Sequence, residues 1–192
     1  MHHPGSTPDR FLLGLLGMSL CLNLILGSAF LRTLRLPADR TDKGQLAQPL
    51  APGTHVPPIE AFTPEGERRE VRFDGENRST VIYVHAPGCY WCRKNAENIQ
   101  FVMEAAPRFR YISLSLQAEA QFNARKPVLQ VQSTLIRPSA ATIRAYRLGA
   151  TPQTIVVTSQ GVVERVWLGA FTGAIGKEVE DYFGIKLPGL QQ

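Results

Sequence analysis

The sequence predicts an α/β domain in which helices cover a central sheet. The apolar, β-branched run at residues 81–84 is typical of a buried strand, and apolar residues at helical spacing follow it. Strand-like and helix-like segments then alternate to the end of the chain, the order expected of such a domain. Hydrophobic residues make up 44% of the 192 residues and charged residues 19%, which is typical of a globular protein and excludes a disordered one.

The first half of the domain contains the strongest strand and the longest helix. Alternation and turn signals place strands at residues 61–63, 70–73, 79–86 and 109–116. In the last of these, the alternation predicts one well-buried face. Apolar residues at 3.6-residue spacing predict a helix that follows the third strand and continues to about Ala106, where Pro107 stops it.

The second half adds a hairpin and two capped helices. Residues 117–125 could form a short helix, and residues 128–136 are strand-like. Ser139 is expected to cap a helix that runs through Tyr146 and is closed by Gly149, and Thr172 to cap a final helix that ends at Gly184. Between these helices, a Ser-Gln-Gly turn joins strands at residues 154–158 and 162–168 into a β-hairpin.

A long apolar segment precedes the domain. After a short tail at residues 1–10, residues 11–31 contain no charged side chain, and 21 residues suffice to cross a bilayer as a helix. A cleaved signal peptide is the alternative, with a small-residue cleavage site near Ala29. Residues 32–55 are rich in Pro, Gly and polar side chains and are interpreted as a linker. The domain is expected to occupy residues 56–192.

The charges beside the apolar segment give opposing indications of its orientation. Arg32, Arg35 and two further cations outnumber Arg10, which favours a cytoplasmic domain. Long domains, however, are translocated largely regardless of charge, so we expect an exported domain. The net charge of +5 is scattered and not interleaved with aromatic residues, so no nucleic-acid partner is predicted.

Two cysteines lie where the strand at residues 79–86 leads into a helix. Backbone N–H groups and the helix dipole at this point stabilise a thiolate on Cys89. One turn further on, Cys92 can close a disulfide with Cys89 and expel a bound partner. Positive charge on Arg93 and Lys94 would lower the thiol pKa further. The pattern predicts disulfide exchange, with Cys89 attacking and Cys92 resolving.

A metal site and a structural disulfide are the alternatives for this pair. The chain has no second Cys pair, and its third cysteine, Cys21, lies in the apolar segment, where it is expected to fill space. His55 and His85 could complete a Cys2His2 set, but their spacing does not suggest one. A disulfide between Cys89 and Cys92 closes too short a loop to constrain the unfolded chain much.

From Val56 onward the chain resembles the TlpA/ResA-type thioredoxin-like proteins, which are membrane-tethered thiol-disulfide oxidoreductases of bacteria. The Cys-Tyr-Trp-Cys unit carries the resemblance together with residues 146–154 and 161–169. It implies a thioredoxin-like fold, with a central mixed sheet flanked by helices. It also implies that Pro152 lies in cis beside the disulfide and that Thr151 offers backbone hydrogen bonds to an incoming partner strand.

The same resemblance implies a function. Cys89 and Cys92 would be the catalytic residues, and Thr151, Pro152, Tyr90 and Trp91 would contact the substrate. No metal or cofactor beyond the redox disulfide is expected. The partners would be protein thiol or disulfide clients and a membrane or periplasmic thiol electron donor, with the domain in the periplasm on a single-pass inner-membrane anchor or soluble there after cleavage. Reduction of exported clients is favoured; a copper metallochaperone, an isomerase and an oxidase are the alternatives.

The chain departs from the thioredoxin pattern at two positions. Gly88 stands where thioredoxins usually carry a Trp, and Tyr83 stands where they carry a buried acid. A tyrosine does not accept a proton near neutral pH, so the usual route for deprotonating Cys92 is in doubt. His85 titrates in the right range and is a candidate base.

Overall fold

The computed structural model describes residues 17–19, 23, 48–75, 77–116 and 133–190, which belong to two compact units, Met1–Thr41 and Asp42–Gln192. In the first unit the described residues are helical, and the Asn23 side chain donates a hydrogen bond of 2.9 Å to the carbonyl of Ser19. Among the described residues no helix has the length and apolar character needed to cross a membrane. The predicted span at residues 11–31 lies almost entirely outside them and stays a prediction.

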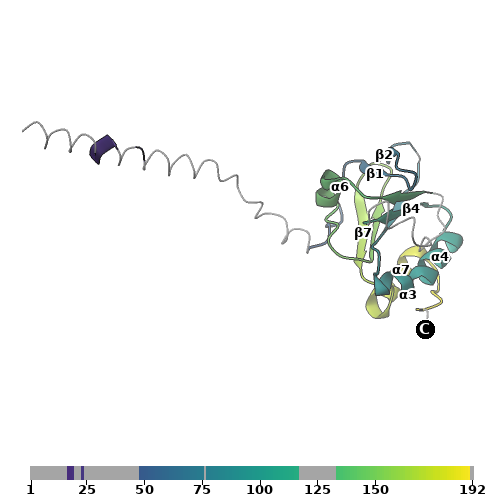
Figure 1. Cartoon of the computed structure of the whole chain (residues 1–192). Helices are drawn as coiled ribbons and strands as arrows, with labels where there is room; N and C mark the ends of the chain where they lie inside the picture. The colour runs from purple at the N-terminus through teal and green to yellow at the C-terminus, as the bar shows by residue number, and fades with distance from the viewer. Residues whose placement is uncertain (1–16, 20–22, 24–47, 76, 117–132, 191–192) are drawn as a thin grey trace, which may run out of the picture. The chain divides into compact units, whose positions relative to one another are not determined.

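The second unit contains a seven-stranded sheet with strand order β2-β1-β5-β4-β3-β6-β7 (Figure 1). The strands are β1 (Ile59–Phe62), β2 (Arg68–Val71), β3 (Thr80–His85), β4 (Arg110–Ser115), β5 (Thr134–Ile136), β6 (Gln153–Val157) and β7 (Val163–Leu168). The helices are α3 (Tyr90–Lys94), α4 (Ala96–Ala105), α6 (Ala140–Ala145) and α7 (Gly173–Phe183). This architecture confirms the predicted α/β class and the mixed sheet.

The central strand β3 sets the register of the sheet. It pairs in parallel with β4 and antiparallel with β6, so that Val84 lies opposite Leu114 on one side and Gln153 on the other. Strand β6 then pairs antiparallel with β7, which confirms the predicted hairpin. Because β3 has neighbours on both sides and helices on both faces, all six of its residues are buried.

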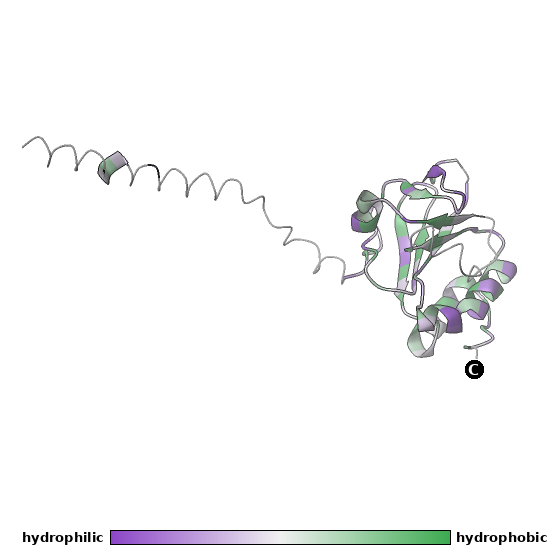
Figure 2. Cartoon of the chain, in the orientation of Figure 1, coloured by the Kyte–Doolittle hydropathy of each residue, from purple (hydrophilic) through white to green (hydrophobic). Residues whose placement is uncertain are grey.

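Each face of the sheet has its own apolar core. The first core contains Ile82, Val84 and Leu114 and is covered by side chains of α6 and of the segment before β1. The second contains Val81 and Tyr83 and is covered by α4 and α7, which lie together on one side of the sheet in Figure 1. In Figure 2 the inner strands are mainly hydrophobic, and hydrophilic residues are concentrated on the outer helices and on β2.

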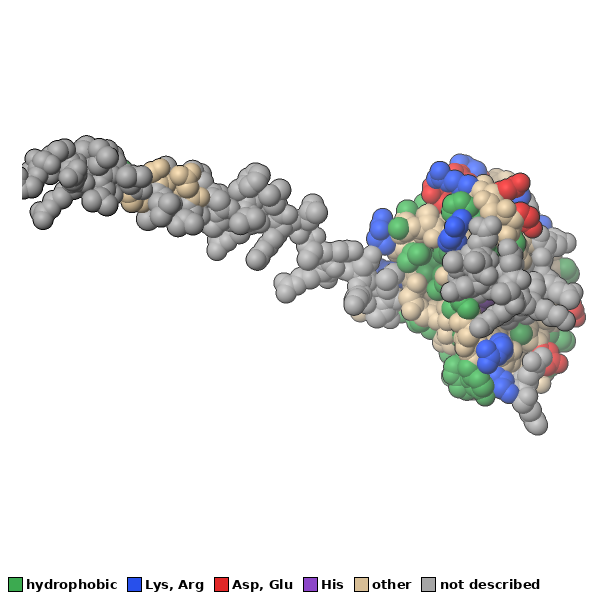
Figure 3. Space-filling model, in the orientation of Figure 1, with side chains coloured by type: hydrophobic (Ala, Val, Ile, Leu, Met, Phe, Trp, Pro, Cys, Tyr) green, Lys and Arg blue, Asp and Glu red, His purple; other side chains and the backbone are tan. Residues whose placement is uncertain are grey.

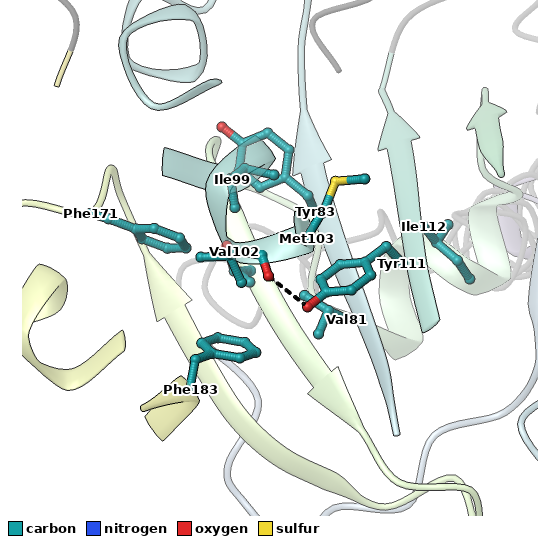
Figure 4. A pocket seen from close by; sticks show the side chains of 10 residues that line it. Val81, Tyr83, Ile99, Val102, Met103, Tyr111, Ile112, Phe171 and Phe183 are labelled. Atoms are coloured by element: carbon teal, nitrogen blue, oxygen red, sulfur yellow. Dashed lines mark hydrogen bonds between the residues drawn. The ribbon is translucent and has the colours of Figure 1, made fainter. Parts of the chain in front are cut away.

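The second core encloses one small cavity between α4 and the sheet (Figure 4). Its volume is about 10 Å³, room for about one water molecule. Val102 and Met103 of α4 line it against Val81 and Tyr111, and the Tyr111 hydroxyl donates a hydrogen bond of 3.1 Å to the Val102 carbonyl. Dense packing here fixes the position of α4, and with it the end of α3.

The structure differs from the sequence prediction at several element boundaries. The helix predicted to run to Ala106 is broken at Asn95, which joins α3 to α4. The closing turn of α6 uses Arg147, with a φ of 51°, rather than Gly149, because the chain reverses two residues earlier. Both faces of β4 are buried over residues 112–115, because β4 is an inner strand. The helix expected at residues 117–125 lies outside the described residues.

The ordered fold also begins before the predicted boundary at Val56. Leu50 is buried in the first core, and the backbone N–H of Gly53 donates a hydrogen bond of 2.8 Å to the carbonyl of Val163. The Val163 N–H in turn donates to the Thr54 carbonyl at 2.9 Å. Residues 50–55, predicted to be linker, are therefore hydrogen-bonded to the start of β7, with one isolated bridge between His55 and Val162.

Candidate active site

Cys89 and Cys92 form a disulfide at the start of α3. Cys89 is the N-cap residue of this helix, and its sulfur accepts a hydrogen bond of 3.1 Å from the backbone N–H of Cys92. Cys89 is half-buried, whereas Cys92 is fully buried. The two cysteines are therefore unequal: Cys89 is partly exposed and its sulfur accepts a backbone hydrogen bond, whereas Cys92 has no exposed surface.

The residue before this pair explains one departure noted in the sequence. Gly88 has a φ of 71°, in the left-handed region that residues with a side chain rarely adopt. A tryptophan at this position would be strained, so the glycine follows from the backbone path that leads from β3 into α3.

Two aromatic rings between the cysteines face solvent. Tyr90 is 53% exposed and Trp91 is 52% exposed, and their rings meet edge to face at a centroid distance of 5.3 Å. In the described part of residues 48–190 they are the only large hydrophobic side chains with such exposure. The ammonium of Lys94 lies 5.7 Å from the centre of the Tyr90 ring. A client that reaches Cys89 therefore encounters an aromatic surface.

The peptide bond between Thr151 and Pro152 is cis, as predicted. Gln153 directly follows and pairs with Val84, one residue before the end of β3, so Pro152 lies at the sheet end from which the chain leads to Cys89. The Pro152 carbonyl accepts a hydrogen bond of 2.8 Å from Gly169. Neither backbone group of Thr151 is hydrogen-bonded to another residue in the described part of the chain, and its side chain is half-buried.

Solved structures with this arrangement are thioredoxin domains and related proteins. The thioredoxin domain of a thiol-disulfide oxidoreductase from Bacteroides vulgatus matches 70% of this chain and 99% of its own, with 17% identity and a TM-score of 0.54. The dsbF structure from Mycobacterium tuberculosis matches 74% and 99%, with 16% identity and a TM-score of 0.52. A protein from Chlorobium tepidum, assigned as the thiol:disulfide interchange protein DsbE, matches 70% and 95%, with 20% identity and a TM-score of 0.51.

The domain has a thioredoxin-like fold. At these identities the similarity concerns the arrangement of the chain and not its substrates. No protein-family model matches the sequence, and a search of curated proteins gives no match.

Behind the disulfide, the thioredoxin-like domain carries Tyr83 at the position expected for a buried acid. Its hydroxyl donates a hydrogen bond of 3.4 Å to the backbone carbonyl of Cys92. Burial raises the pKa of Tyr83, so the phenol stays protonated at any physiological pH. Tyr83 thus supports the backbone of α3 and does not accept a proton from Cys92.

His85 is buried in the sheet rather than exposed beside the cysteines. Its Nε2 is 2.9 Å from the hydroxyl of Ser113 on the neighbouring strand, and its ring lies 6.0 Å from that of Tyr83. Burial lowers the pKa of His85 to about 4, so the imidazole is neutral at pH 7 and a weak base. No hydrogen bond joins it to either cysteine in the described structure, which leaves the hypothesis of a base role without support.

Sequence reasoning missed a set of buried polar groups in the segments that follow α3 and Pro152. In the described part of the chain, the buried side-chain atoms without a hydrogen-bond partner are Asn95 Nδ2, both amide atoms of Gln153, and Thr154 Oγ1. Asn95 directly follows α3, and Gln153 and Thr154 directly follow Pro152. The sequence did contain a signal for two of them: Gln153 and Thr154 directly precede the β-branched run at residues 155–157, so they belong to the same buried strand.

The candidate metal ligands do not come together. Among the residues that the structure describes, no group of three or more His, Cys, Asp or Glu side chains could hold a metal ion. His85 is bonded to Ser113, and His55 lies in an isolated bridge with Val162 on the far side of β6 from β3. Among the described residues at this site, the disulfide is the group with redox chemistry.

Proposed function

We propose that the protein is a thiol-disulfide oxidoreductase that acts through Cys89 and Cys92. The inequality of the two sulfurs carries this proposal. Cys89 is accessible and faces the N–H of Cys92, which favours a thiolate, while Cys92 is buried one turn away within disulfide-bonding distance. Tyr90, Trp91 and the backbone of Thr151, which forms no hydrogen bond with another described residue, would provide the surface for a client.

In the reducing direction the reaction has two steps. The Cys89 thiolate attacks one sulfur of a client disulfide, forms a mixed disulfide and releases the other client sulfur as a thiolate. The Cys92 thiolate then attacks the Cys89 sulfur, forming the internal disulfide and releasing the second client thiolate. The client gains two electrons and the protein loses two, and the client thiolates take up the protons that the cysteines gave up. A thiol donor must reduce the pair again.

We further propose that the domain is exported and tethered to the membrane through residues 11–31. The supporting observation is that this segment is apolar and contains no charged side chain. A reporter enzyme that is active only after export, fused after Gln192, should then be active. A cytoplasmic reporter that is active at the same position would contradict the proposed orientation.

Trapping of clients tests the assigned roles of the cysteines. In Cys92→Ser the second step cannot occur, so clients should remain on Cys89 as mixed disulfides, released by reductant and identified by mass spectrometry. The matched variant Cys89→Ser should trap few, because its remaining thiol is buried. Equal trapping by both variants would show that the roles are not separated, and trapping by neither would contradict the proposed function.

Copper binding by the reduced pair is the second candidate from the sequence. Two cysteine thiolates can hold copper(I) by themselves, so the observation that favours disulfide exchange is the difference in burial between Cys89 and Cys92. Titration of the reduced protein with copper(I) against a chelator of known affinity separates the two. Tight binding that Cys89→Ser and Cys92→Ser both abolish would favour the copper function.

A further inference from the structure

We infer that the client segment recognised around Cys89 is acidic, with carboxylate side chains flanking its target cysteine. This inference rests on the proposed function and names the substrate class of the same site. In the described segments around Cys89 and Pro152, the surface that a client must cover combines exposed aromatic rings with cations and contains no carboxylate.

The aromatic part of this surface lies between the cysteines. Tyr90 and Trp91 are about half exposed, in contrast to every other described large hydrophobic side chain of residues 48–190. Exposed Trp and Tyr side chains are typical of residues that dominate binding energy in interfaces. Tyr90 and Trp91 directly follow Cys89 in the chain, so a client whose sulfur reaches Cys89 is expected to contact them. Because the rings are apolar, they supply affinity without selecting a charge.

The cationic part follows one turn later. Arg93 is exposed and Lys94 is half-buried with its ammonium near the Tyr90 ring. Neither side chain forms an ion pair with a residue in the described part of the chain, whereas Lys186 and three arginine–carboxylate contacts elsewhere are paired. Figure 3 shows Lys and Arg side chains beside a hydrophobic patch at the place that α3 occupies in Figure 1.

The absence of carboxylates extends through both segments that form the site. Residues 85–96, which contain the disulfide, include no Asp or Glu; the first is Glu97 in α4. Residues 148–158, which contain Thr151 and Pro152, include no charged side chain. Within these two segments a carboxylate on the client would meet complementary charge from Arg93 and Lys94, and an ammonium would meet none.

Positive charge at this place acts on clients in two ways. It raises the rate at which acidic segments encounter Cys89, and the effect weakens as salt screens it. It also disfavours basic segments, which gives discrimination between clients that share the same exposed disulfide. Residues 42–192 contain 17 Lys and Arg against 14 Asp and Glu, and this net charge of +3 strengthens the long-range part, while Arg93 and Lys94 provide the local part.

Rates with matched peptides test the inference. Three synthetic peptides carry one cysteine as a mixed disulfide with 2-mercaptoethanol, flanked by Asp and Glu, by Asn and Gln, or by Lys. The reduced wild-type protein should react roughly tenfold faster with the acidic than with the uncharged peptide at low salt, and slowest with the basic one. The preference should shrink in 0.5 M salt.

Two double variants locate the preference. Arg93→Gln with Lys94→Gln should lose most of the ratio between acidic and uncharged peptides. Arg69→Gln with Arg72→Gln removes the same charge from β2 and from the residue that directly follows it, at the opposite edge of the sheet from β6 and β7, and should keep this ratio. The ratio of two rates for one variant does not depend on how reactive its Cys89 thiol is. Comparing this ratio between variants also cancels the intrinsic reactivity of each peptide disulfide. A wild-type ratio near one, or equal loss in both variants, would overturn the inference.

Failure of the proposed function is seen separately. Reduced protein is also mixed with the uncharged peptide and with neutral 2,2′-dithiodipyridine. If the protein reacts with both compounds and the three peptides react at equal rates, only the inference of an acidic client is overturned. Failure to react with either overturns the oxidoreductase function, and with it the inference.

Discussion

The two faces of the sheet are made by the same strands but bury different side chains. On the first face, the neighbours Val84, Leu114 and Ile155 are fully buried aliphatic residues. On the second face, the corresponding positions one residue along include Tyr83 and Thr154, which are buried as well. Alternation of side chains along a strand keeps the two sets apart.

This difference places the redox pair against one face and not the other. The first, aliphatic face buries mainly apolar side chains, and such burial contributes about 25 cal/mol per Å² of apolar area. In the described part of the chain, unpartnered polar atoms occur on both faces: Gln153, which pairs with Val84, belongs to the first face, and Thr154 belongs to the second. Burying an unpartnered polar group costs about 1–3 kcal/mol. Cys92 lies on the second face, where the Tyr83 hydroxyl donates to its carbonyl.

Truncation on the aliphatic face should have the largest effect. Leu114→Ala is expected to lower the free energy of unfolding by about 2–5 kcal/mol, because it leaves a cavity in a dense core. Urea unfolding of the oxidised and the reduced protein should show the same loss, since Leu114 lies on the face away from the disulfide. A loss of stability in only one of the two redox forms would contradict the view that Leu114 and the disulfide act on separate faces of the sheet.

The second face should make stability depend on pH through His85. Its pKa is about 4 in the folded protein and 6.5 in the unfolded chain, so the unfolded state binds the extra proton first. The free energy of unfolding is therefore highest above pH 6.5 and should fall by about 3 kcal/mol as the pH drops to 4.

Denaturant unfolding at a series of pH values measures this dependence. His85→Gln should remove most of the slope between pH 6.5 and 4. The control His55→Gln changes an exposed histidine and should leave the slope unchanged. An unaltered slope in His85→Gln would mean that other groups cause it.

Removing an unpartnered hydroxyl should stabilise the second face. Thr154→Val deletes a buried oxygen without a partner and should raise the free energy of unfolding by about 1 kcal/mol. Thr80→Val is the matched control, because the buried hydroxyl of Thr80 accepts a hydrogen bond of 3.0 Å from Arg110. The control should lose about 1 kcal/mol. Thermal unfolding of both variants measures these changes. Destabilisation by Thr154→Val would show that the Thr154 hydroxyl forms a hydrogen bond in the folded protein.

The smallest effect is expected from Tyr83→Phe. The hydrogen bond to the Cys92 carbonyl is long, so its loss should cost only about 0.5 kcal/mol. Because Tyr83 remains protonated, the pH profile of Cys92 alkylation in the reduced protein should not move. A shift of that profile would give Tyr83 a part in proton transfer and not only in support of α3.

The sequence by itself determined the local parts of this protein. The strand at β3, the cysteine pair at the start of a helix, the Ser139 cap and the β6–β7 hairpin were all predicted from periodicity and turn residues. The cis bond before Pro152 was predicted from a resemblance and is confirmed. These features depend on residues close together in the chain, so local propensities suffice to indicate them.

Only the tertiary structure decided which of the candidate residues serve the site. His85 is a candidate base in the sequence, but strand pairing buries it, which lowers its pKa to about 4 and leaves it bonded to Ser113. Tyr83 is excluded as a base by its residue type, and its burial raises its pKa further. Likewise the unpartnered atoms of Asn95 and Thr154 come from segments 59 residues apart in the chain. Burial and hydrogen-bond pairing are set by which segments meet across the fold, and that information is not contained in any short stretch of sequence.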